Sequence, residues 1–170
     1  MKKTDKKVDH KERSPISAEA MKLRLAGLCA RSEQCEYDLR QKIFKAGLSG
    51  SESDEIIGFL RTNRYLDEER YAAAYTRDKV RFAGWGRRKI RQGLSAKRVS
   101  SAAIDRAIDS IDSKEYIAAL KRAGIAKARS INISSPEDRA KFYRHLASRG
   151  FEMELIHKLA DAIIAKLGNK

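Results

Sequence analysis

The chain has 170 residues and a formal net charge of +14, with 37 Lys and Arg against 23 Asp and Glu. Such a basic balance favours a polyanionic partner, either nucleic acid or an acidic protein surface. No apolar stretch approaches the roughly 20 residues that span a bilayer, and no signal-peptide segment opens the chain, so we expect a cytoplasmic protein with no membrane partner. Two cysteines six residues apart, Cys29 and Cys35, cannot form a disulfide framework and are interpreted as reduced thiols.

The first third of the chain predicts a charged tail followed by three helices. Residues 1–16 contain almost no apolar side chains, which predicts a disordered basic tail that either adds affinity for phosphates or only aids solubility. Met21, Leu25 and Leu28 recur at helical spacing after Ser17 and predict a helix to about Arg31. The next helix ends at Gly47, residues 49–51 are expected to form a loop, and a short helix is expected to open at residues 53–55.

The central stretch, residues 65–99, predicts two helices separated by glycines. Asp67 is placed as the N-cap of a helix over residues 67–82, with two glutamates in its first turn. Gly84 and Gly86 break that helix, and Trp85 between them is interpreted as a packing residue at the helix junction. After Gly86 comes a second helix that is almost purely basic.

The same apolar spacing returns three times along the chain. The spacing at Leu39, Ile43 and Gly47 is repeated about 50 residues later and again in the last third, at the following positions: Ile90, Leu94 and Arg98, then Phe142, Leu146 and Gly150. A unit of about 50 residues is near the lower limit for independent folding, so neighbouring units are expected to share apolar contacts. We therefore predict an all-α fold, an elongated array of three tandem, helix-turn-helix-like three-helix repeats over residues 17–63, 64–111 and 112–168. The segment 130–136 is the expected hinge, with Ser135 as an N-cap and Pro136 at the first helical position.

The basic residues around Gly86 are the candidate binding site. On the helix after Gly86 the arginines share one arc, and cations at the end of the preceding helix extend it. These side chains could present several forks to phosphates or carboxylates, although a merely solvated face is the alternative. The predicted partner-binding or DNA-binding residues are Arg77, Lys79, Arg81, Arg87, Arg88, Arg91, Lys97 and Arg98.

Catalytic and metal sites are not predicted. His145 and His157 are on different predicted helices without neighbouring ligands at metal spacing, and the three carboxylates from Asp67 onward are explained by helix capping. The residues 84–86 do not continue into a nucleotide-binding glycine pattern. We therefore expect no cofactor and no enzyme activity.

The central stretch resembles the signature of the RecX family, the bacterial regulators of the RecA recombinase. The resemblance lies in Tyr65-Leu66-Asp67-Glu68-Glu69-Arg70-Tyr71-Ala72, followed by Gly86, Ile90, Leu94 and Lys97 at fixed spacing, and weaker agreement extends over residues 18–167. Position 98 is arginine where the family usually has glycine, which leaves the geometry of that turn open.

Two functions follow from the residues: a basic helical scaffold that binds nucleic acid directly, or one that docks on a protein assembly. The resemblance favours the second. It implies a non-enzymatic modulator, expected to inhibit, that lies in the groove of the RecA–DNA filament and suppresses filament growth, ATP hydrolysis, strand exchange and co-protease activity. Such a protein takes part in homologous recombination, DNA repair and the SOS response. We expect a monomer that binds single- and double-stranded DNA weakly, and the alternative is a basic helical protein that acts on DNA directly.

Overall fold

The computed structural model describes residues 16–168, with side chains to residue 165, so the predicted tail lies almost wholly outside the described residues. Within this range the chain forms α-helices joined by short turns, without strands. The helices are α1 (Ala18–Arg31), α2 (Glu36–Lys45), α3 (Gly50–Thr62), α4 (Glu68–Arg81), α5 (Arg87–Ala96), α6 (Ser101–Asp109), α7 (Ser113–Ala128), α8 (Pro136–Ser148) and α9 (Met153–Gly168).

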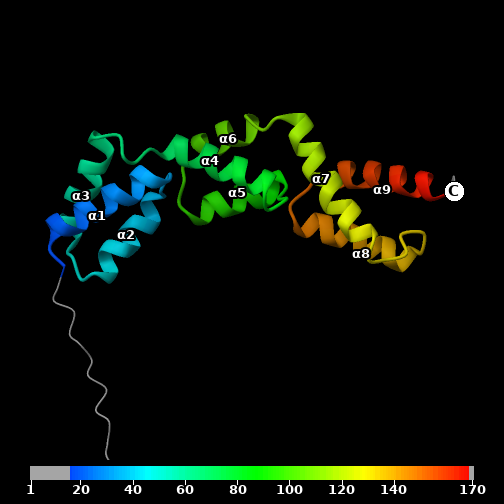
Figure 1. The fold of residues 1–170 in the computed structure, drawn as a ribbon, viewed down its shortest axis with the longest axis horizontal. Helices are drawn as coiled ribbons and strands as arrows, with labels where there is room; N and C mark the ends of the chain where they lie inside the picture. The colour runs from blue at the N-terminus through cyan, green and yellow to red at the C-terminus, as the bar shows by residue number, and fades with distance from the viewer. Residues whose placement is uncertain (1–15, 169–170) are drawn as a thin grey trace, which may run out of the picture.

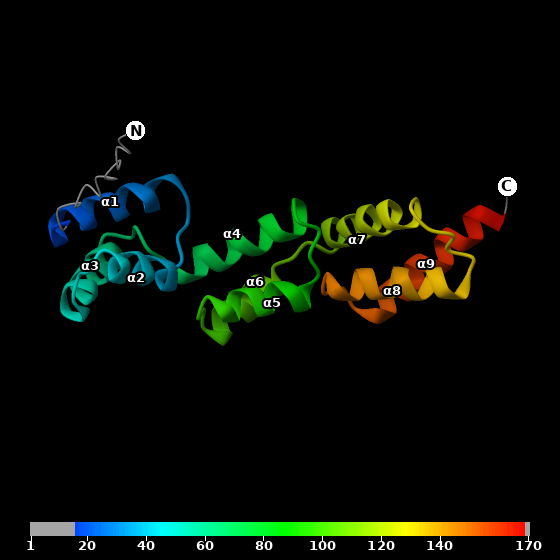
Figure 2. The ribbon, with the colours of Figure 1, turned by 90° about the horizontal axis from the view of Figure 1, so that it is seen from below.

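The helices lie in three groups along one axis, as Figures 1 and 2 show. The group α1–α3 has its own core, centred on Leu25, Ile43 and Leu60. The helices α4–α9 share a second, continuous core, in which Ile90 and Leu94 belong to the same cluster as Phe142. The all-helical array is therefore as predicted. The repeat limits at residues 63/64 and 111/112 stay a prediction.

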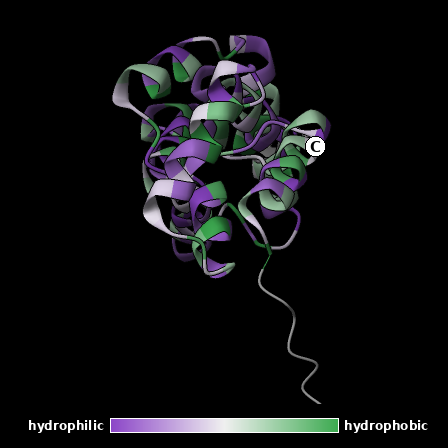
Figure 3. Ribbon diagram, turned by 90° about the vertical axis from the view of Figure 1, so that its left-hand side faces the viewer, coloured by the Kyte–Doolittle hydropathy of each residue, from purple (hydrophilic) through white to green (hydrophobic). Residues whose placement is uncertain are grey.

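The helices bury apolar side chains, such as Leu39 and Ile43 of α2, and expose polar side chains on the opposite face. In the view along the axis, hydrophobic and hydrophilic residues alternate along the helices (Figure 3). In the part of the chain that the structure describes, no helix combines the length and apolar character needed to cross a bilayer.

Side-chain caps fix most of the helix starts that were predicted. Ser17 accepts a hydrogen bond from the Ala20 amide at 3.2 Å, and Asp67 accepts one from the Arg70 amide at 2.9 Å. Ser135 caps α8, with Pro136 at its first position. Each cap satisfies an amide that the first helical turn leaves without a partner, which is why these boundaries can be read locally.

The prediction for the start of α3 was wrong by several residues. Ser49 is the N-cap: its hydroxyl accepts from the Glu52 amide at 3.3 Å, and the Glu52 carboxylate accepts from the Ser49 amide at 2.7 Å. This reciprocal capping box turns the expected loop at residues 49–51 into the first turn of the helix.

The turn after α2, α5 and α8 is the same motif in all three groups. In each case an amide two residues beyond the C-cap donates to a carbonyl five residues back, as Val99 does to Leu94 at 3.2 Å and Phe151 to Leu146 at 3.3 Å. The residue between adopts positive φ: 82° at Gly47, 58° at Arg98 and 87° at Gly150. Arg98 thus takes the left-handed conformation that the repeat requires, without being glycine.

The expected hinge at residues 130–136 is not a free linker. Ile133 in its middle is buried in the core of α4–α9. The Asn132 amide donates to the Asp138 carboxylate at 2.9 Å, which ties the turn to the first turn of α8. The segment joins two helices of one group and packs against them, so its polar composition reflects a turn rather than a hinge.

Candidate functional site

The basic segment after Gly86 has no acid of its own, but packing brings acids to it from other groups. Arg87 is half-buried against the third group: its Nη1 lies 3.1 Å from Glu152 Oε1, and its guanidinium lies 4.0 Å from the centre of the Tyr116 ring. The Tyr116 hydroxyl accepts from the Arg87 amide at 3.0 Å and donates to Glu152 at 2.7 Å. Burial and the bond to Glu152 raise the pKa of Tyr116, so the hydroxyl stays a donor. Arg87 therefore holds two helix groups together.

Lys97 and Arg98 are directed to the first group. Lys97 Nζ donates to both oxygens of Asp38, at 2.8 and 2.7 Å, and the hydrogen bonds with Asp38 raise the pKa of Lys97. The Arg98 guanidinium lies 4.9 Å from the centre of the Tyr37 ring. Both cations thus connect α5 to the start of α2.

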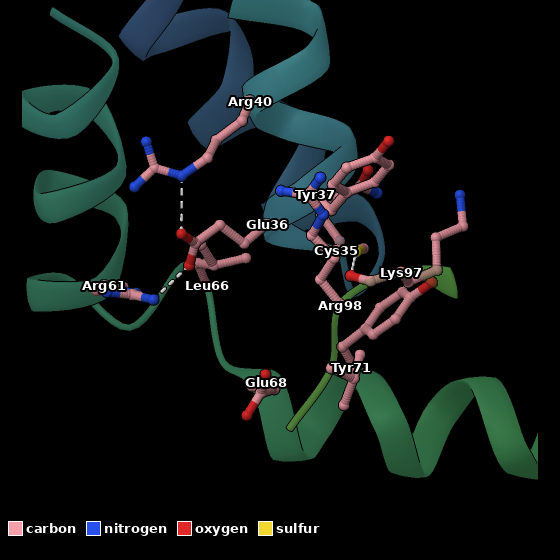
Figure 4. A pocket seen from close by; sticks show the side chains of 12 residues that line it. Cys35, Glu36, Tyr37, Arg40, Arg61, Leu66, Glu68, Tyr71, Lys97 and Arg98 are labelled. Atoms are coloured by element: carbon pink, nitrogen blue, oxygen red, sulfur yellow. Dashed lines mark hydrogen bonds and ion pairs between the residues drawn. The ribbon is translucent and has the colours of Figure 1, made fainter. Parts of the chain in front are cut away.

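A cavity of about 310 Å³ lies beside this connection, between the first two groups. Its wall includes Cys35, Tyr71 and Arg98, and Arg40 and Arg61 reach Glu36 across it (Figure 4). Burial is the main cause that raises the pKa of the Cys35 thiol and of Tyr71, so both groups stay protonated at neutral pH. The thiol donates to the Lys97 carbonyl at 3.3 Å, which makes Cys35 a part of the connection rather than a nucleophile.

Two more of the predicted site residues are paired with carboxylates. Arg81 contacts Glu115 at the start of α7, and Arg91 Nη1 lies 2.7 Å from Asp105 on α6. Arg77 is more loosely placed, since its Nε lies 3.9 Å from Asp78 beside it in the chain. The arc of arginines therefore exists, but most of it faces the protein's own acids.

A smaller cationic surface is left around Trp85, and we call it the Trp85 patch: Lys79, Trp85, Arg88 and Lys89. The ammonium groups of Lys79 and Lys89 lie 4.8 and 4.7 Å from the centre of the Trp85 ring. Trp85 itself is half-buried against the core. Arg88 is exposed, and no described carboxylate lies within ion-pair distance of these three cations. The patch can offer forked and single donors to an anionic surface.

The structure has a second basic region that the sequence patterns did not predict. A groove of about 410 Å³ runs between α7, the end of α4 and α8, and we call it the α7 groove. Cations from three elements border it: Arg81, Arg122, Lys127 and Arg149. The signal that could have revealed it is a second stretch without an acidic residue, residues 116–136, which resembles the one at residues 79–104.

Among the described residues no cluster of three or more His, Cys, Asp or Glu is placed to hold a metal ion. His145 borders the α7 groove, where burial and the charges of Arg149 and Lys127 lower its pKa. A neutral imidazole fits its contact there, because His145 Nε2 accepts a hydrogen bond from Arg149 Nε at 3.2 Å. The cations that border the groove therefore favour an anionic ligand.

Comparison with known proteins matches the sequence of the chain to one family. Two family models match the chain, described as the second three-helix domain of RecX over residues 67–108 and the third over residues 114–159. The protein named Regulatory protein RecX from Vibrio vulnificus is 31% identical over 135 residues, which cover 79% of this chain and 87% of that protein. The protein of that name from Clostridium tetani is 25% identical over 95% of this chain and 77% of its own length.

Two solved structures share the arrangement of helices. A crystal structure of regulatory protein RecX superposes with a TM-score of 0.74 at 21% identity, covering 85% of this chain and 73% of that one. The crystal structure of RecX from Lactobacillus salivarius gives a TM-score of 0.73 at 15% identity, over 87% of this chain and 97% of that one. At these identities the likeness concerns the fold.

Proposed function

The chain belongs to the RecX family, and on that premise we propose that it regulates the RecA recombinase by binding in the groove of the RecA–DNA filament. The regulation is inhibition without catalysis. A protein seated in the groove bridges adjacent protomers and opposes the filament's growth, ATP hydrolysis, strand exchange and co-protease activity. It acts as a cytoplasmic monomer in recombination, repair and the SOS response, and its contacts with DNA alone are weak.

The elongated array supports this proposal. Three helix groups follow one another along a single axis (Figure 1), so one elongated molecule can touch successive subunits of a filament. Contacts that are weak one by one combine when they are linked, because the first contact raises the effective concentration of the others. A globular protein of the same size would reach fewer subunits.

The unpaired cations of the Trp85 patch are the observation from which we assign the filament contact to particular residues. Most cations of the central segment are paired within the protein, whereas Arg88 and the lysines beside Trp85 are not. Unpaired cations on a folded surface bind acids or phosphates without first losing an internal partner. We assign the filament contact to this patch and to Arg77, which is exposed and has only the 3.9 Å contact with Asp78.

The test is RecA ATP hydrolysis on single-stranded DNA with the protein titrated from substoichiometric to equimolar amounts. The wild type is expected to inhibit at low ratios. The double variant R77E/R88E is expected to need about tenfold more protein for the same inhibition at low salt, since both residues are exposed and charge reversal turns attraction into repulsion.

A matched control reverses two exposed lysines of α2, in the variant K42E/K45E, which changes the net charge equally. This control is expected to inhibit nearly as well as the wild type. Equal weakening by both double variants would mean that net charge, not the patch, determines inhibition. Full inhibition by R77E/R88E would remove the patch from the mechanism.

A further inference from the structure

The α7 groove has a floor of small side chains and a border of cations. Three alanines of α7, Ala119, Ala123 and Ala126, line it. Because alanine side chains are short, the groove stays open beside the longer side chains at its border. Its volume of about 410 Å³ is within the range of roughly 300 to 1,000 Å³ that is usual for binding pockets.

The cations of the groove are less neutralised than those of α5. Arg81 is paired with Glu115, but no described carboxylate lies within ion-pair distance of Arg122, Lys127 or Arg149. No Asp or Glu lines the groove. This arrangement creates a concentrated positive potential in a concave surface, where the low-dielectric walls strengthen the field.

The two unpaired arginines are held in place by backbone carbonyls. Arg149 Nη1 donates to the carbonyls of Ala83 and Gly84, at 2.8 and 3.5 Å, and Arg122 Nη2 donates to the carbonyl of Arg81 at 3.3 Å. Each guanidinium carries five N–H donors, so both retain donors beyond these contacts. Anchored guanidinium groups lose little freedom when an anion binds, which favours binding.

An exposed aromatic ring lies at the same border. Phe82, the residue after α4, is 83% exposed although it is apolar, and it lines the groove beside Arg81. A site for single-stranded nucleic acid has two parts: cations that contact the phosphate backbone, and an aromatic ring that stacks on a base. An acidic peptide would use the cations but would leave the exposed ring without a role.

We propose that the α7 groove binds single-stranded nucleic acid, with Arg122, Lys127 and Arg149 on its phosphates and Phe82 stacked on a base. The site is separate from the Trp85 patch and needs no RecA for its test. It rests on the proposed function, which includes weak contacts with DNA, and deepens it by assigning those contacts to one groove and to single strands. Binding to single-stranded nucleic acid is measured without RecA, so its absence can be distinguished from an absence of RecA inhibition.

The experiment measures binding of the full chain to a fluorescently labelled oligothymidine by anisotropy over a series of salt concentrations. The variant R122Q/K127Q is expected to lose about tenfold or more in affinity at low salt. Its slope of log affinity against log salt is expected to fall by about 1.4, since each lost phosphate contact on a single strand contributes about 0.7. The matched control K121Q/R129Q removes two exposed cations of the same helix region outside the groove, and it is expected to change affinity less than about threefold.

The stacking ring has its own pair of variants. F82A is expected to lose roughly fivefold or more in affinity with no change in the salt slope, since stacking involves no counterion release. F44A removes another ring, 76% exposed on α2 and outside the groove, and is expected to leave binding unchanged. Circular dichroism of all four variants confirms that each keeps the wild-type helicity.

Three outcomes would overturn the proposal. Equal losses in R122Q/K127Q and K121Q/R129Q would mean diffuse surface charge. A duplex that binds as tightly as the single strand and is equally sensitive to F82A would rule out base stacking. An oligoglutamate peptide that displaces the oligothymidine at lower concentration than unlabelled oligothymidine does would assign the groove to an acidic protein segment.

Discussion

Backbone joins the second helix group to the third, whereas side chains join the first to the second. The Gly86 amide donates to the Arg149 carbonyl at 2.7 Å, and the Arg88 amide donates to the Gly150 carbonyl at 3.2 Å. This approach needs two glycines, because a Cβ on Gly86 would lie 2.2 Å from Gly150 carbonyl atoms. The start of α5 is thus capped by the turn of another group.

The equivalent positions one repeat earlier carry Cys35 and Arg98, 51 and 52 residues before Gly86 and Gly150. Here the links are the thiol on the Lys97 carbonyl, the ion pairs of Lys97 with Asp38 and of Arg70 with Glu33, and the stacking of Arg98 on Tyr37. The cavity of about 310 Å³ remains between the two groups.

Equivalent positions of the repeat thus join neighbouring groups in two different ways, and we expect the two junctions to differ in stiffness. The second and third groups share a core and two backbone hydrogen bonds, so we expect them to move as one body. The first group has a separate core and half-exposed polar links, which are worth little individually. We infer that bending of the array occurs at the first junction, not at the predicted hinge of residues 130–136.

The largest expected effect comes from Gly150→Ala. The new Cβ would lie 2.3 Å from the Lys89 amide nitrogen, and φ is 87°, so the variant combines a backbone clash with left-handed strain. We expect a loss of about 3 kcal/mol in the free energy of unfolding, measured by urea denaturation.

Gly47→Ala is its matched control at the same repeat position. Its φ is 82°, but nothing lies within 4 Å of the new Cβ, so only strain of about 1 kcal/mol is expected. Similar losses in both variants would show that the close contact of Gly150 contributes nothing to the junction.

Tyr116→Phe breaks the backbone junction less severely. It removes the hydroxyl that accepts from the Arg87 amide and donates to Glu152, which leaves the partly buried amide without this partner and removes one of the two hydrogen bonds of the carboxylate. We expect a loss of about 1.5 kcal/mol in the free energy of unfolding by urea denaturation. A loss below about 0.5 kcal/mol would mean that water replaces the hydroxyl.

The same tyrosine gives the junction a pH dependence. Its pKa is raised in the folded state above the ordinary value of 10.0, so its contribution to stability is complete below pH 10.0 and is lost as the pH rises further. The wild type should therefore lose stability above pH 10 more steeply than Tyr116→Phe. Parallel losses would assign the alkaline decline to other groups, including Tyr71, whose pKa is also raised.

Sequence patterns predicted the helices well because caps and periodicity are local. Asp67 and Ser135 fixed their helix starts, and the spacing of Ile90 and Leu94 revealed the repeat. The partners of the basic residues could not be predicted, because they are far apart in the chain: Glu152 is 65 residues from Arg87, and Asp38 is 59 from Lys97. Which cations stay unpaired is decided by packing between groups.

The ion pair of Asp38 with Lys97 is expected to contribute less than the backbone junction. Both side chains are more than one-third exposed, with relative exposures of 37% and 35%, so solvent screens their attraction. A double-mutant cycle with Asp38→Asn and Lys97→Met should give a coupling free energy of about 0.5 to 1 kcal/mol. A coupling of about 2 kcal/mol or more would contradict the comparison, because the side-chain junction would then be as strong as the backbone one.

The smallest effect is expected for Arg98→Gly, at the position where the family usually has glycine. Glycine relieves left-handed strain of about 1 kcal/mol at φ 58°, but it removes the stacking on Tyr37, worth about 0.5 to 1 kcal/mol at an exposed site. The two terms nearly cancel, so the free energy of unfolding should change by less than about 0.5 kcal/mol.

Hydrogen exchange should still report a difference: amides at the start of α2 should exchange faster in Arg98→Gly, because one of the links that hold the first junction is gone. Unchanged exchange there would mean that the links through Asp38, Cys35 and Glu33 suffice to hold the first group, and that Arg98 contributes only the turn.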